Sequence, residues 1–349
     1  MARRKIVALR FDLGGNELLK EHDNYNPSNL SSAKMSNPRQ IREEITAKII
    51  AALEKDLLPW RRPWASNNAG QHSNALTKKS YRGVNPLLLQ LHAAEHDFSS
   101  NWWATFNQWK QLGCSVNRRP DHVEAGHWGA TLAVYIPVTK KAEEPADDDE
   151  DEEETFWILK KFVVFNADQV NGANAEQFQA VETVGDVHPD YEPAEELIEK
   201  TGAEIHFGGD RAFYRPPVGT WPNHHDGDFI QVPHKSSFVN GSFYPTILHE
   251  LGHWSEVRVG WDREKGGYAM GELIAEIASC YLASELGVPN GEPLDNHAAY
   301  LKSWLEGMHG DPNYIFKASR QASKVCDFLL SFVRQAETES VKNEMVEAA

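Results

Sequence analysis

The segment 247–254, Ile-Leu-His-Glu-Leu-Gly-His-Trp, constrains the fold of this chain more than any other. Its apolar residues surround two histidines, so the segment predicts a helix that is at least half buried. His249 and His253 are four residues apart, which directs both side chains to one face, where they can bind one metal ion. Glu250 can then act as the base toward a water activated by that ion. The alternative is a pair of core histidines with satisfied ring nitrogens, and the intact pentapeptide on an apolar helix favours the metal site.

Residues 268–287 predict a second helix that supplies the third metal ligand. Its apolar residues recur at helical spacing, and Gly287 suits a C-terminal stop. Glu272 and Glu276 lie one turn apart on one face, where two carboxylates repel unless a positive group is close. A catalytic zinc takes three protein ligands and keeps one position open, so we expect Glu272 to be the third ligand. Glu276 is expected to orient a liganding histidine, and the reverse assignment and an exposed acidic stripe are the alternatives.

These residues predict a zinc-dependent hydrolase of the zincin type, with Zn²⁺ or another divalent ion as its cofactor. Glu250 would take a proton from water and later pass it to the leaving amine of a peptide substrate. Tyr268 is a candidate hydrogen-bond donor to the developing oxyanion. The segment 228–233, Asp-Phe-Ile-Gln-Val-Pro, is expected either at a sheet edge that holds an extended peptide or inside the sheet as an ordinary strand.

The length of 349 residues is sufficient for two domains of ordinary size, and the mixture of helical and strand patterns predicts the α+β class. Three isolated cysteines, at positions 114, 280 and 326, indicate neither a disulfide scaffold nor a cysteine zinc site, which fits a reducing compartment. The N-terminus does not resemble a signal peptide, and no apolar run is long enough to cross a membrane. We therefore expect a cytoplasmic chain with no membrane partner.

The net charge of −16 is concentrated in one segment. Residues 142–154 hold ten acidic side chains and no basic one. Such a run repels itself and is expected to form a disordered loop. Residues 37–141 instead hold 14 Lys and Arg against 8 Asp and Glu, a net of +6. This basic region is also rich in tryptophan, which suggests a polyanionic partner for the first half of the chain.

Patterning along the chain predicts two domains with shorter segments around them. The first domain is expected to contain three helices and a two-stranded hairpin. The second is expected to contain a helix, two strands, the two motif helices and a helical tail. Met35 is an alternative start of the chain. The expected segments are a disordered leader (1–36), the first domain (37–165, with the acidic loop 142–154), a linker (166–190), the second domain (191–335) and a polar tail (336–349).

Several sequence blocks occur in the order that one known family shows, over about residues 40–290. They include Pro-Trp-Arg-Arg-Pro-Trp (59–64), Tyr-Arg-Gly-Val-Asn (81–85), Thr-Phe-Asn-Gln-Trp-Lys-Gln-Leu-Gly (105–113), Gly-Gly-Asp-Arg-Ala-Phe-Tyr (208–214) and Glu-Leu-Ile-Ala-Glu (272–276). In these blocks the chain resembles ArdC-type antirestriction proteins, whose N-terminal domain is shared with TraC-type plasmid primases. The resemblance implies a single-stranded-DNA-binding domain, a zincin-like metallopeptidase domain, and a role in shielding incoming plasmid or phage DNA from restriction. The leader, the acidic loop and Gly271, which stands where a second glutamate is common, depart from the family pattern.

The residues of the first domain support DNA binding independently of the resemblance. Binding single strands without sequence preference needs cations for the phosphates and flat aromatic faces for the bases, worth ~1–3 kcal/mol per stacked base. Two clusters combine both features, although the alternatives are tryptophans buried in the core and a charged face with no partner. The candidate DNA-binding residues are Trp60, Arg61, Arg62 and Trp64 in the first cluster and Lys78, Lys79, Tyr81 and Arg82 in the second.

Three functions from different classes are consistent with the sequence. The first is a single-stranded-DNA-binding protein whose zinc peptidase domain cuts a protein near the DNA. The second is a module that coats single strands and whose metal only stabilises the fold. The third is a primase accessory protein. Glu250 favours the first function, because a structural metal site has no need of that carboxylate.

Overall fold

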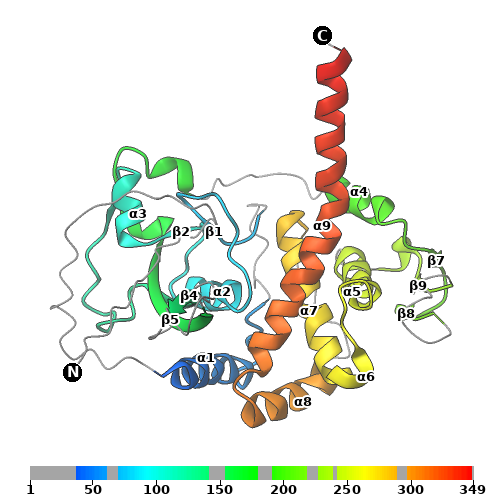
Figure 1. Cartoon of the computed structure of the whole chain (residues 1–349), viewed down its shortest axis with the longest axis horizontal. Coiled ribbons are helices and arrows are strands. Elements are labelled where there is room, and N and C mark those ends of the chain that lie inside the picture. The colour runs from blue at the N-terminus through cyan, green and yellow to red at the C-terminus, as the bar shows by residue number, and fades with distance from the viewer. Residues whose placement is uncertain are drawn as a thin grey trace, which may run out of the picture.

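The computed structural model shows two parts that lie side by side (Figure 1). The N-terminal part is built around a sheet, and the C-terminal part is mainly helical. Several sequence expectations fall outside the described residues: the leader with Met35, the acidic loop up to residue 153, and the residues Arg61, Arg62 and Trp64. The described residues are 37–60, 70–140, 154–179, 191–217, 227–238, 242–288 and 297–347.

The first helix, α1 (Pro38–Leu53), begins three residues before the apolar pattern that predicts it. Its start is set by a reciprocal cap. The side chain of Asn37 accepts a hydrogen bond from the backbone N–H of Arg39 (3.0 Å), and the side chain of Gln40 accepts one from the N–H of Asn37 (3.2 Å). Such a cap satisfies backbone donors that a helix start leaves free. The apolar residues on the buried face are Ile41, Ile45, Ile49 and Leu53.

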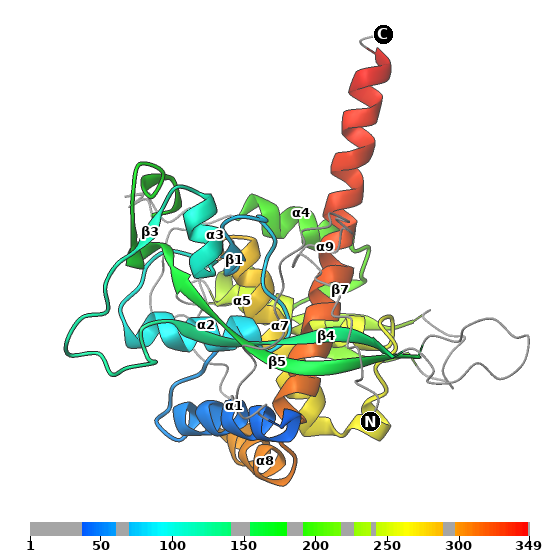
Figure 2. The same ribbon diagram turned by 60° about the vertical axis from the view of Figure 1, so that its left-hand side comes forward.

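A four-stranded sheet forms the centre of the N-terminal part, in the order β1-β2-β5-β4. The expected hairpin is its longest element: β4 and β5 pair antiparallel from Ala130 opposite Val164 to Lys140 opposite Glu154. Figure 2 shows the two strands as one long twisted ribbon that crosses the front of the view. The elements of this part after α1 are β1 (Ser73–Asn74), α2 (Asn85–Glu95), β2 (Trp102–Ala104), α3 (Phe106–Gln111), β3 (Ser115–Val116), β4 (Ala130–Lys140) and β5 (Glu154–Asn166).

Residues 166–179 are not a linker, which corrects the first half of the expectation for 166–190. Phe178 is buried against Trp109, with ring centroids 5.3 Å apart. The hydroxyl of Ser100 donates to the carbonyl of Phe178 (2.6 Å). The segment therefore closes a small second hydrophobic cluster, although its sequence shows no apolar periodicity. Its elements are η2 (Ala167–Gln169), β6 (Val170–Asn171), which pairs with β3, and η3 (Glu176–Phe178).

The C-terminal part packs helices around α7 and carries a small sheet on one side (Figure 1). The helix α9 continues through the expected polar tail as far as Glu347. The elements of this part are α4 (Glu192–Lys200), β7 (Ile205–Phe207), β8 (Phe213–Arg215), β9 (Phe229–Val232), η4 (Lys235–Ser237), α5 (Phe243–Glu256), α6 (Arg263–Gly266), α7 (Tyr268–Glu285), α8 (His297–Gly310) and α9 (Tyr314–Glu347).

The segment 228–233 is an internal strand and not a sheet edge, so the alternative reading of it is the correct one. The strand order is β7-β9-β8, which places β9 in the middle. Ile230 of β9 pairs with Ile205 of β7 on one side and with Tyr214 of β8 on the other. The edge strands are β7 and β8, and sequence patterning did not anticipate β8.

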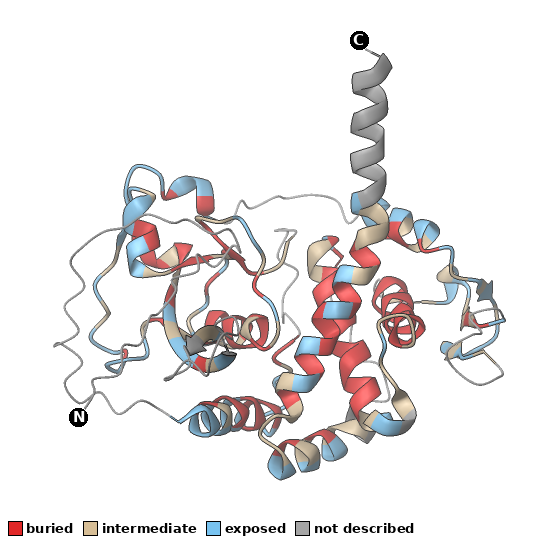
Figure 3. Cartoon of the chain, viewed as in Figure 1, coloured by how far each residue is buried: buried red, intermediate tan, exposed pale blue. Residues whose placement is uncertain are grey.

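The helices α5 and α7 cross at a glycine. A Cβ atom added to Gly252 of α5 would lie 3.1 Å from the Cα of Ala275 on α7. Because glycine lacks that atom, the two helix backbones can approach closely. Figure 3 shows both helices buried along most of their length. The close approach brings the first turns of α7 beside the histidines of α5.

The two parts share one hydrophobic core. Buried residues form a continuous cluster from Ile41 in α1 to Leu330 in α9. Polar contacts cross the same boundary, since the hydroxyl of Tyr281 donates to the carbonyl of Gly83 (2.9 Å). The relative placement of the two parts is therefore fixed by packing. No helix within the described ranges combines the length and the apolarity that crossing a bilayer requires.

Candidate metal centre

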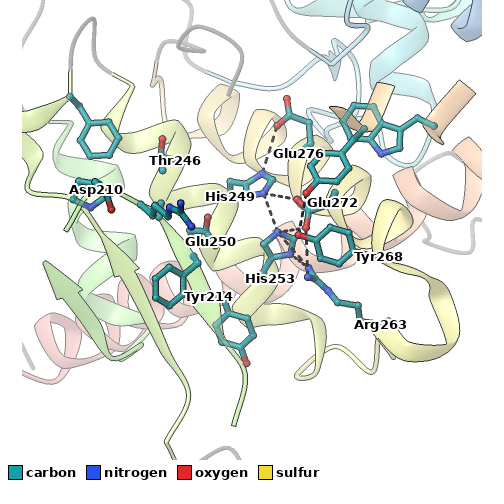
Figure 4. A pocket seen from close by; sticks show the side chains of 17 residues that line it. Asp210, Tyr214, Thr246, His249, Glu250, His253, Arg263, Tyr268, Glu272 and Glu276 are labelled. Carbon is teal, nitrogen blue, oxygen red and sulfur yellow. Dashed lines mark hydrogen bonds and ion pairs between the residues drawn. The ribbon is translucent and has the colours of Figure 1, made fainter. Parts of the chain in front are cut away.

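One face of α5 directs three polar side chains into a cleft (Figure 4). His249, Glu250 and His253 are only 6%, 7% and 5% exposed. The four-residue spacing of the histidines puts their rings on one side of the helix, with centroids 4.7 Å apart. The burial follows from the apolar residues that flank them, which pack into the core as the sequence predicts.

Glu272 of α7 completes a compact set of donor atoms with the two histidines. Its carboxylate oxygens lie 3.5 Å from Nε2 of His249 and 3.4 Å from Nε2 of His253. The two Nε2 atoms are 3.0 Å apart. One ligand atom from each of the three residues therefore lies within 4.8 Å of the others, and all three residues are buried. The structure brings together the three residues that the sequence nominates as ligands.

Glu276 lies on the opposite side of the His249 ring from Glu272. Its Oε2 atom is 3.7 Å from Nδ1 of His249, whereas Glu272 faces Nε2 of the same ring. The indole Nε1 of Trp60 donates to Oε1 of Glu276 (3.2 Å). This geometry suits Glu276 for orienting His249 and leaves Glu272 nearer to the second histidine. Trp60 thus links the N-terminal part to the centre.

Two residues of the centre were not anticipated from the sequence. Glu256 Oε1 lies 2.9 Å from Nδ1 of His253, closer than Glu276 lies to His249, so it holds this ring from the side away from Glu272. Arg263 donates to both carboxylate oxygens of Glu256, at 2.9 and 3.0 Å. The signal for Glu256 was present, because it lies three residues after His253 on the same helix. Arg263 had no such signal, but Gly271 leaves room for it: a Cβ at Gly271 would lie 3.1 Å from Nε of Arg263.

Opposite charges decide the protonation of these buried groups. Burial alone raises the pKa of Glu272, but hydrogen bonds with His249 and His253 hold that pKa well below its usual range. Burial lowers the pKa of His249, yet contacts with Glu272 and Glu276 raise it to about 10. Burial likewise opposes ionisation of Glu256, and His253 and Arg263 lower its pKa. The centre therefore favours carboxylate anions and a positive charge among them.

The chemistry of the donor set fits a divalent cation. Four carboxylates, those of Glu250, Glu256, Glu272 and Glu276, are each at most 7% exposed. Buried carboxylates are stable only when they are paired with positive groups or coordinate a metal. Arg263 contacts two of the four, Glu256 and Glu272. Two imidazoles and a carboxylate are also a set that zinc takes in catalytic sites.

The cleft in front of these residues has a volume of about 590 Å³. Tyr268 at the start of α7 lines it and is 56% exposed. The hydroxyls of Tyr268 and Tyr300 are hydrogen-bonded to each other (3.1 Å), and this contact is the main cause of a raised pKa for Tyr268. The edge strand β8 lines the cleft on another side, through Phe213 and Tyr214. The opening thus lies between a sheet edge and two tyrosines.

Two of the expected DNA-stacking residues are buried, so the expectation of exposed rings is wrong for them. Trp60 is 4% exposed and packs edge-on against Trp304, with centroids 5.8 Å apart. Tyr81 is 9% exposed, and its hydroxyl accepts from the amide of Asn74 (3.1 Å). Burial raises the pKa of Tyr81 to about 12. Both rings are covered by residues distant in sequence, which local charge patterns do not reveal.

The remaining described candidates are cations with different surroundings. Arg82 pairs with Asp327 of α9 through two hydrogen bonds, so it joins the two parts of the molecule. Lys78 lies over the rings of Trp102 (4.6 Å) and Phe178 (4.2 Å), and partial burial lowers its pKa. Lys79 is exposed in the same turn. Arg61, Arg62 and Trp64 lie in the gap after residue 60, so the structure does not place them.

The fold and the centre define a class of protein: an α+β chain in which a mixed domain precedes a zincin-like metallopeptidase domain. Residues 39–165 match the family model of the N-terminal domain of the anti-restriction factor ArdC, and residues 192–321 match that of a zincin-like metallopeptidase. The chain belongs to the ArdC-type antirestriction family, which confirms the resemblance noted in its sequence.

Solved structures and curated relatives agree with this membership. The antirestriction protein ArdC from plasmid R388, in a metal-free crystal structure, is 31% identical, with a TM-score of 0.65 over 84% of this chain and 98% of that one. Its Mn(II)-bound structure is 30% identical, with a TM-score of 0.60. The protein y4eC of Sinorhizobium fredii is 29% identical over 87% of this chain and 96% of its own length. Two DNA primases TraC of Escherichia coli are each 30% identical, and this chain spans only 29% and 21% of their lengths.

Proposed function

We propose that this chain binds single-stranded DNA through its N-terminal domain and hydrolyses peptide bonds at a divalent-metal centre in its C-terminal domain. We infer that both activities serve to protect incoming plasmid or phage DNA from restriction. The antirestriction proteins to which the chain is similar support that role. The observation that carries the enzymatic half is the convergence of His249, His253 and Glu272 beside the buried carboxylate of Glu250.

The proposed cofactor is Zn²⁺, held by His249, His253 and Glu272. The donor set of two imidazoles and one carboxylate supports zinc, and the Mn(II)-bound structure of the similar ArdC protein makes Mn²⁺ the main competitor. A bound divalent ion supplies Lewis acidity, which polarises a carbonyl and acidifies water. Glu256 and Glu276 then act as positioning residues, because each carboxylate faces the ring nitrogen that points away from the ligand set, at 2.9 Å from His253 for Glu256 and at 3.7 Å from His249 for Glu276.

Glu250 is the proposed general base and acid. It follows His249 on the same helix, lines the same cleft and is buried, so its carboxylate lies beside the space that the ligand atoms surround. Its role is to take a proton from the attacking water and to return it to the leaving amine. Tyr268 is the proposed hydrogen-bond donor to the developing oxyanion. Its place in the wall of the cleft supports that role, because a tyrosine hydroxyl there can donate to a group bound beside the ligand atoms.

The proposed substrate is an extended peptide segment that adds to the sheet along β8. The outer side of this strand pairs with no other strand of the described residues, and Phe213 and Tyr214 line the cleft. An exposed strand edge offers backbone hydrogen bonds to an extended chain, while pockets for alternate side chains select its sequence. This arrangement would place a peptide bond beside Glu250.

The proposed DNA-binding surface is revised to the turn 74–79 and the start of α3. Asn74 joins the two: its amide donates to the side chain of Gln108 on α3 (3.1 Å). Lys78 and Lys79 lie in that turn, and Phe106 at the start of α3 is 57% exposed. Neither segment contains an acidic residue. An exposed ring and two cations on adjoining segments have the composition that single-strand binding requires.

The proposed DNA-binding activity is tested by the double substitution Lys79→Ala with Phe106→Ala. We expect affinity for a single-stranded oligonucleotide to fall about tenfold or more, because one stacking face and one phosphate contact are lost. The control pairs Leu57→Ala with Lys302→Ala, which removes an exposed apolar and a basic side chain elsewhere. Fluorescence anisotropy at two salt concentrations measures the DNA affinity of the double variant and of the control variant. Equal affinity of the wild type for single strands and duplex would refute the stacking surface.

The enzymatic half is tested by Glu250→Gln. We expect the variant to retain the metal content of the wild type and to lose peptidase activity by about a hundredfold or more, since it lacks the general base. Unstructured protein substrates and mass spectrometry of their fragments measure the loss, with Glu306→Gln on the surface of α8 as the control. Equal peptidase activity of the variant and the wild type would remove Glu250 from the mechanism.

The same variant separates the peptidase from a module that only coats single strands. If Glu250→Gln protects DNA from a restriction endonuclease in cells as well as the wild type does, the coating function is the correct one. The TraC relatives favour one more candidate, a part of the machinery that primes DNA synthesis. Primer synthesis assays with the purified chain test that candidate.

A further inference from the structure

A second group of metal-ligating side chains lies at the end of α2, in the other part of the molecule. His92, Glu95 and His96 occupy positions i, i+3 and i+4, and one ligand atom from each lies within 4.8 Å of the others. The two imidazole rings have centroids 4.5 Å apart. The histidines repeat the four-residue spacing of His249 and His253, which puts both rings on one face of the helix.

Both histidines of this group have an unsatisfied buried nitrogen. The Nε2 atoms of His92 and His96 are buried and have no hydrogen-bond partner in the described part of the chain. His92 is only 5% exposed. Buried polar atoms are normally paired, so an unpaired nitrogen on each of two adjacent rings points to a ligand that the protein itself does not supply.

The nearby His72 shows how the same core satisfies a buried histidine that is only structural. Its Nδ1 accepts from the indole Nε1 of Trp103 (3.0 Å), and its Nε2 lies 3.3 Å from the side-chain oxygen of Gln90. Both ring nitrogens of His72 therefore have a partner. The histidines of α2 pack against the same aromatic cluster but lack such partners at Nε2.

The surroundings of the group keep its nitrogens available to a cation. Phe98 stacks on His96 at 5.3 Å, and Trp128 meets the same ring edge-on at 5.9 Å, so apolar rings form the wall. His92 is buried, and burial disfavours the protonated form of an imidazole, so its ring keeps a lone pair for a cation. The C-terminal end of a helix also favours positive charge, and His96 is the C-cap of α2.

The charged neighbours of the group have both signs. Lys48 of α1 and His127 of the loop before β4 both lower the pKa of His92. Glu95 is exposed at the rim and offers the negative charge that a divalent ion needs. His127 adds a further imidazole near the group. The combination is two imidazoles and one carboxylate, a donor set that suits zinc-type ions and not Mg²⁺ or Ca²⁺.

We propose that His92, Glu95 and His96 bind a second divalent metal ion of the zinc type, and Zn²⁺ is the ion used to test the site. Its role is structural: it satisfies the buried ring nitrogens and holds the last turn of α2 in place beside the aromatic wall. The inference does not depend on the proposed peptidase, because no residue of the C-terminal centre takes part. The two sites can therefore be removed separately.

The test is a metal count on the full-length chain after treatment with a chelator and titration with Zn²⁺. We expect two equivalents in the wild type, one in His96→Asn, one in His249→Asn with His253→Asn, and none when all three changes are combined. Glu95→Gln, at an exposed position, should weaken one of the two sites about tenfold or more. His309→Asn, which changes an exposed histidine of α8, is the control and should leave both equivalents in place.

A second readout does not depend on counting. Zn²⁺ should raise the melting temperature of the His249→Asn, His253→Asn variant, and it should not raise that of the variant which also carries His96→Asn. If His96→Asn fails to fold without metal, Glu95→Gln decides the question through its Zn²⁺ affinity. The proposal is overturned if the wild type binds a single equivalent that only the changes at His249 and His253 abolish, or if Glu95→Gln binds both equivalents as tightly as the wild type does.

Discussion

His253 illustrates how single residues set the chemistry of the centre. Its Nε2 faces Glu272 at 3.4 Å, and its Nδ1 faces Glu256 at 2.9 Å. A carboxylate behind the ring fixes the tautomer and raises the basicity of the nitrogen that faces the metal. Arg263 in turn holds Glu256 through two hydrogen bonds. The ligand is therefore oriented by a chain of contacts whose last members come from outside the motif.

Glu256→Gln tests this orientation at the residue scale. We expect Zn²⁺ affinity to fall about 10- to 100-fold, because an amide is a weaker acceptor for the His253 ring and no longer pairs with Arg263. Competition with a chromophoric chelator measures the change. Glu306→Gln, on the exposed face of α8, should leave the affinity as it is. An unchanged affinity in Glu256→Gln would show that His253 needs no such partner.

Tyr81 provides a pH dependence with a definite sign. Its pKa is raised to about 12 in the folded chain, above the ordinary tyrosine value of about 10. The stability that this residue contributes is therefore complete below pH 10 and is lost as the pH rises toward 12, because the unfolded chain ionises first. Tyr81→Phe should lose less stability than the wild type between about pH 9 and about pH 11 in denaturant titrations. Parallel losses in the two proteins would mean that Tyr81 is exposed.

At this scale the sequence predicts ligands better than surfaces. His249, His253 and Glu272 follow from helical spacing, which is a local property of the chain. Trp60 and Tyr81 resemble exposed stacking residues because their neighbours in sequence are cations. Trp60 is buried by residues more than two hundred positions away in the sequence. The neighbours of a residue in the sequence carry no information about such contacts.

The crossing of α5 and α7 is the element-scale feature on which the centre depends. The histidines and Glu272 come from different helices, so their distances are set by how closely the two axes approach. Gly252 permits that approach, because a Cβ there would lie 3.1 Å from the Cα and 3.3 Å from the Cβ of Ala275. A glycine inside a helix usually lowers helix stability. The close packing against Ala275 therefore explains why a glycine stands between His249 and His253.

Gly252→Ala is expected to separate the two helices. The added methyl group should cost about 1–3 kcal/mol of stability through overpacking and should weaken Zn²⁺ binding, since Glu272 moves away from the histidines. Gly310→Ala is the matched control, because a Cβ there meets no atom within 4 Å. Chemical denaturation and metal titration measure both variants. A Gly252→Ala variant that binds metal as tightly as the wild type would show that the close crossing is not required.

The elements that sequence patterns missed share a physical cause. The strand β8 has three residues, too few for an alternating pattern to be recognised, and it exists because β9 pairs with it. Residues 166–179 hold their place through Phe178 and short turns, not through a periodic element. The long elements α1, α5, α7 and the β4–β5 hairpin were predicted, because each carries its own apolar period.

At the scale of the whole molecule, specific contacts join the proposed DNA-binding part to the part that holds the metal centre. Trp60, which ends the described segment after α1, donates to Glu276 and packs on Trp304 of α8. Arg82 pairs with Asp327 of α9, and Thr46 of α1 donates to the carbonyl of Pro312 (2.9 Å). The expected division into two domains therefore hides a shared core, which segment composition could not reveal.

Trp60→Phe tests whether the N-terminal part supports the centre. The substitution keeps an aromatic ring against Trp304 but removes the indole donor to Glu276. We expect Zn²⁺ affinity to fall about tenfold while the folded structure persists, because Glu276 loses one of the contacts that hold it behind His249. Trp157→Phe, at a position that is 64% exposed, is the control. If both variants bind Zn²⁺ equally well, the two parts act independently.

The metal centre is tested most directly by anomalous diffraction from crystals of the full-length chain grown with Zn²⁺, recorded at the zinc absorption edge. We expect a peak in the cleft within bonding distance of Nε2 of His249, Nε2 of His253 and the carboxylate of Glu272, with Glu276 behind the ring of His249. A cleft without a peak at saturating Zn²⁺, or an ion there bound by other residues, would show that these three residues are not the ligands.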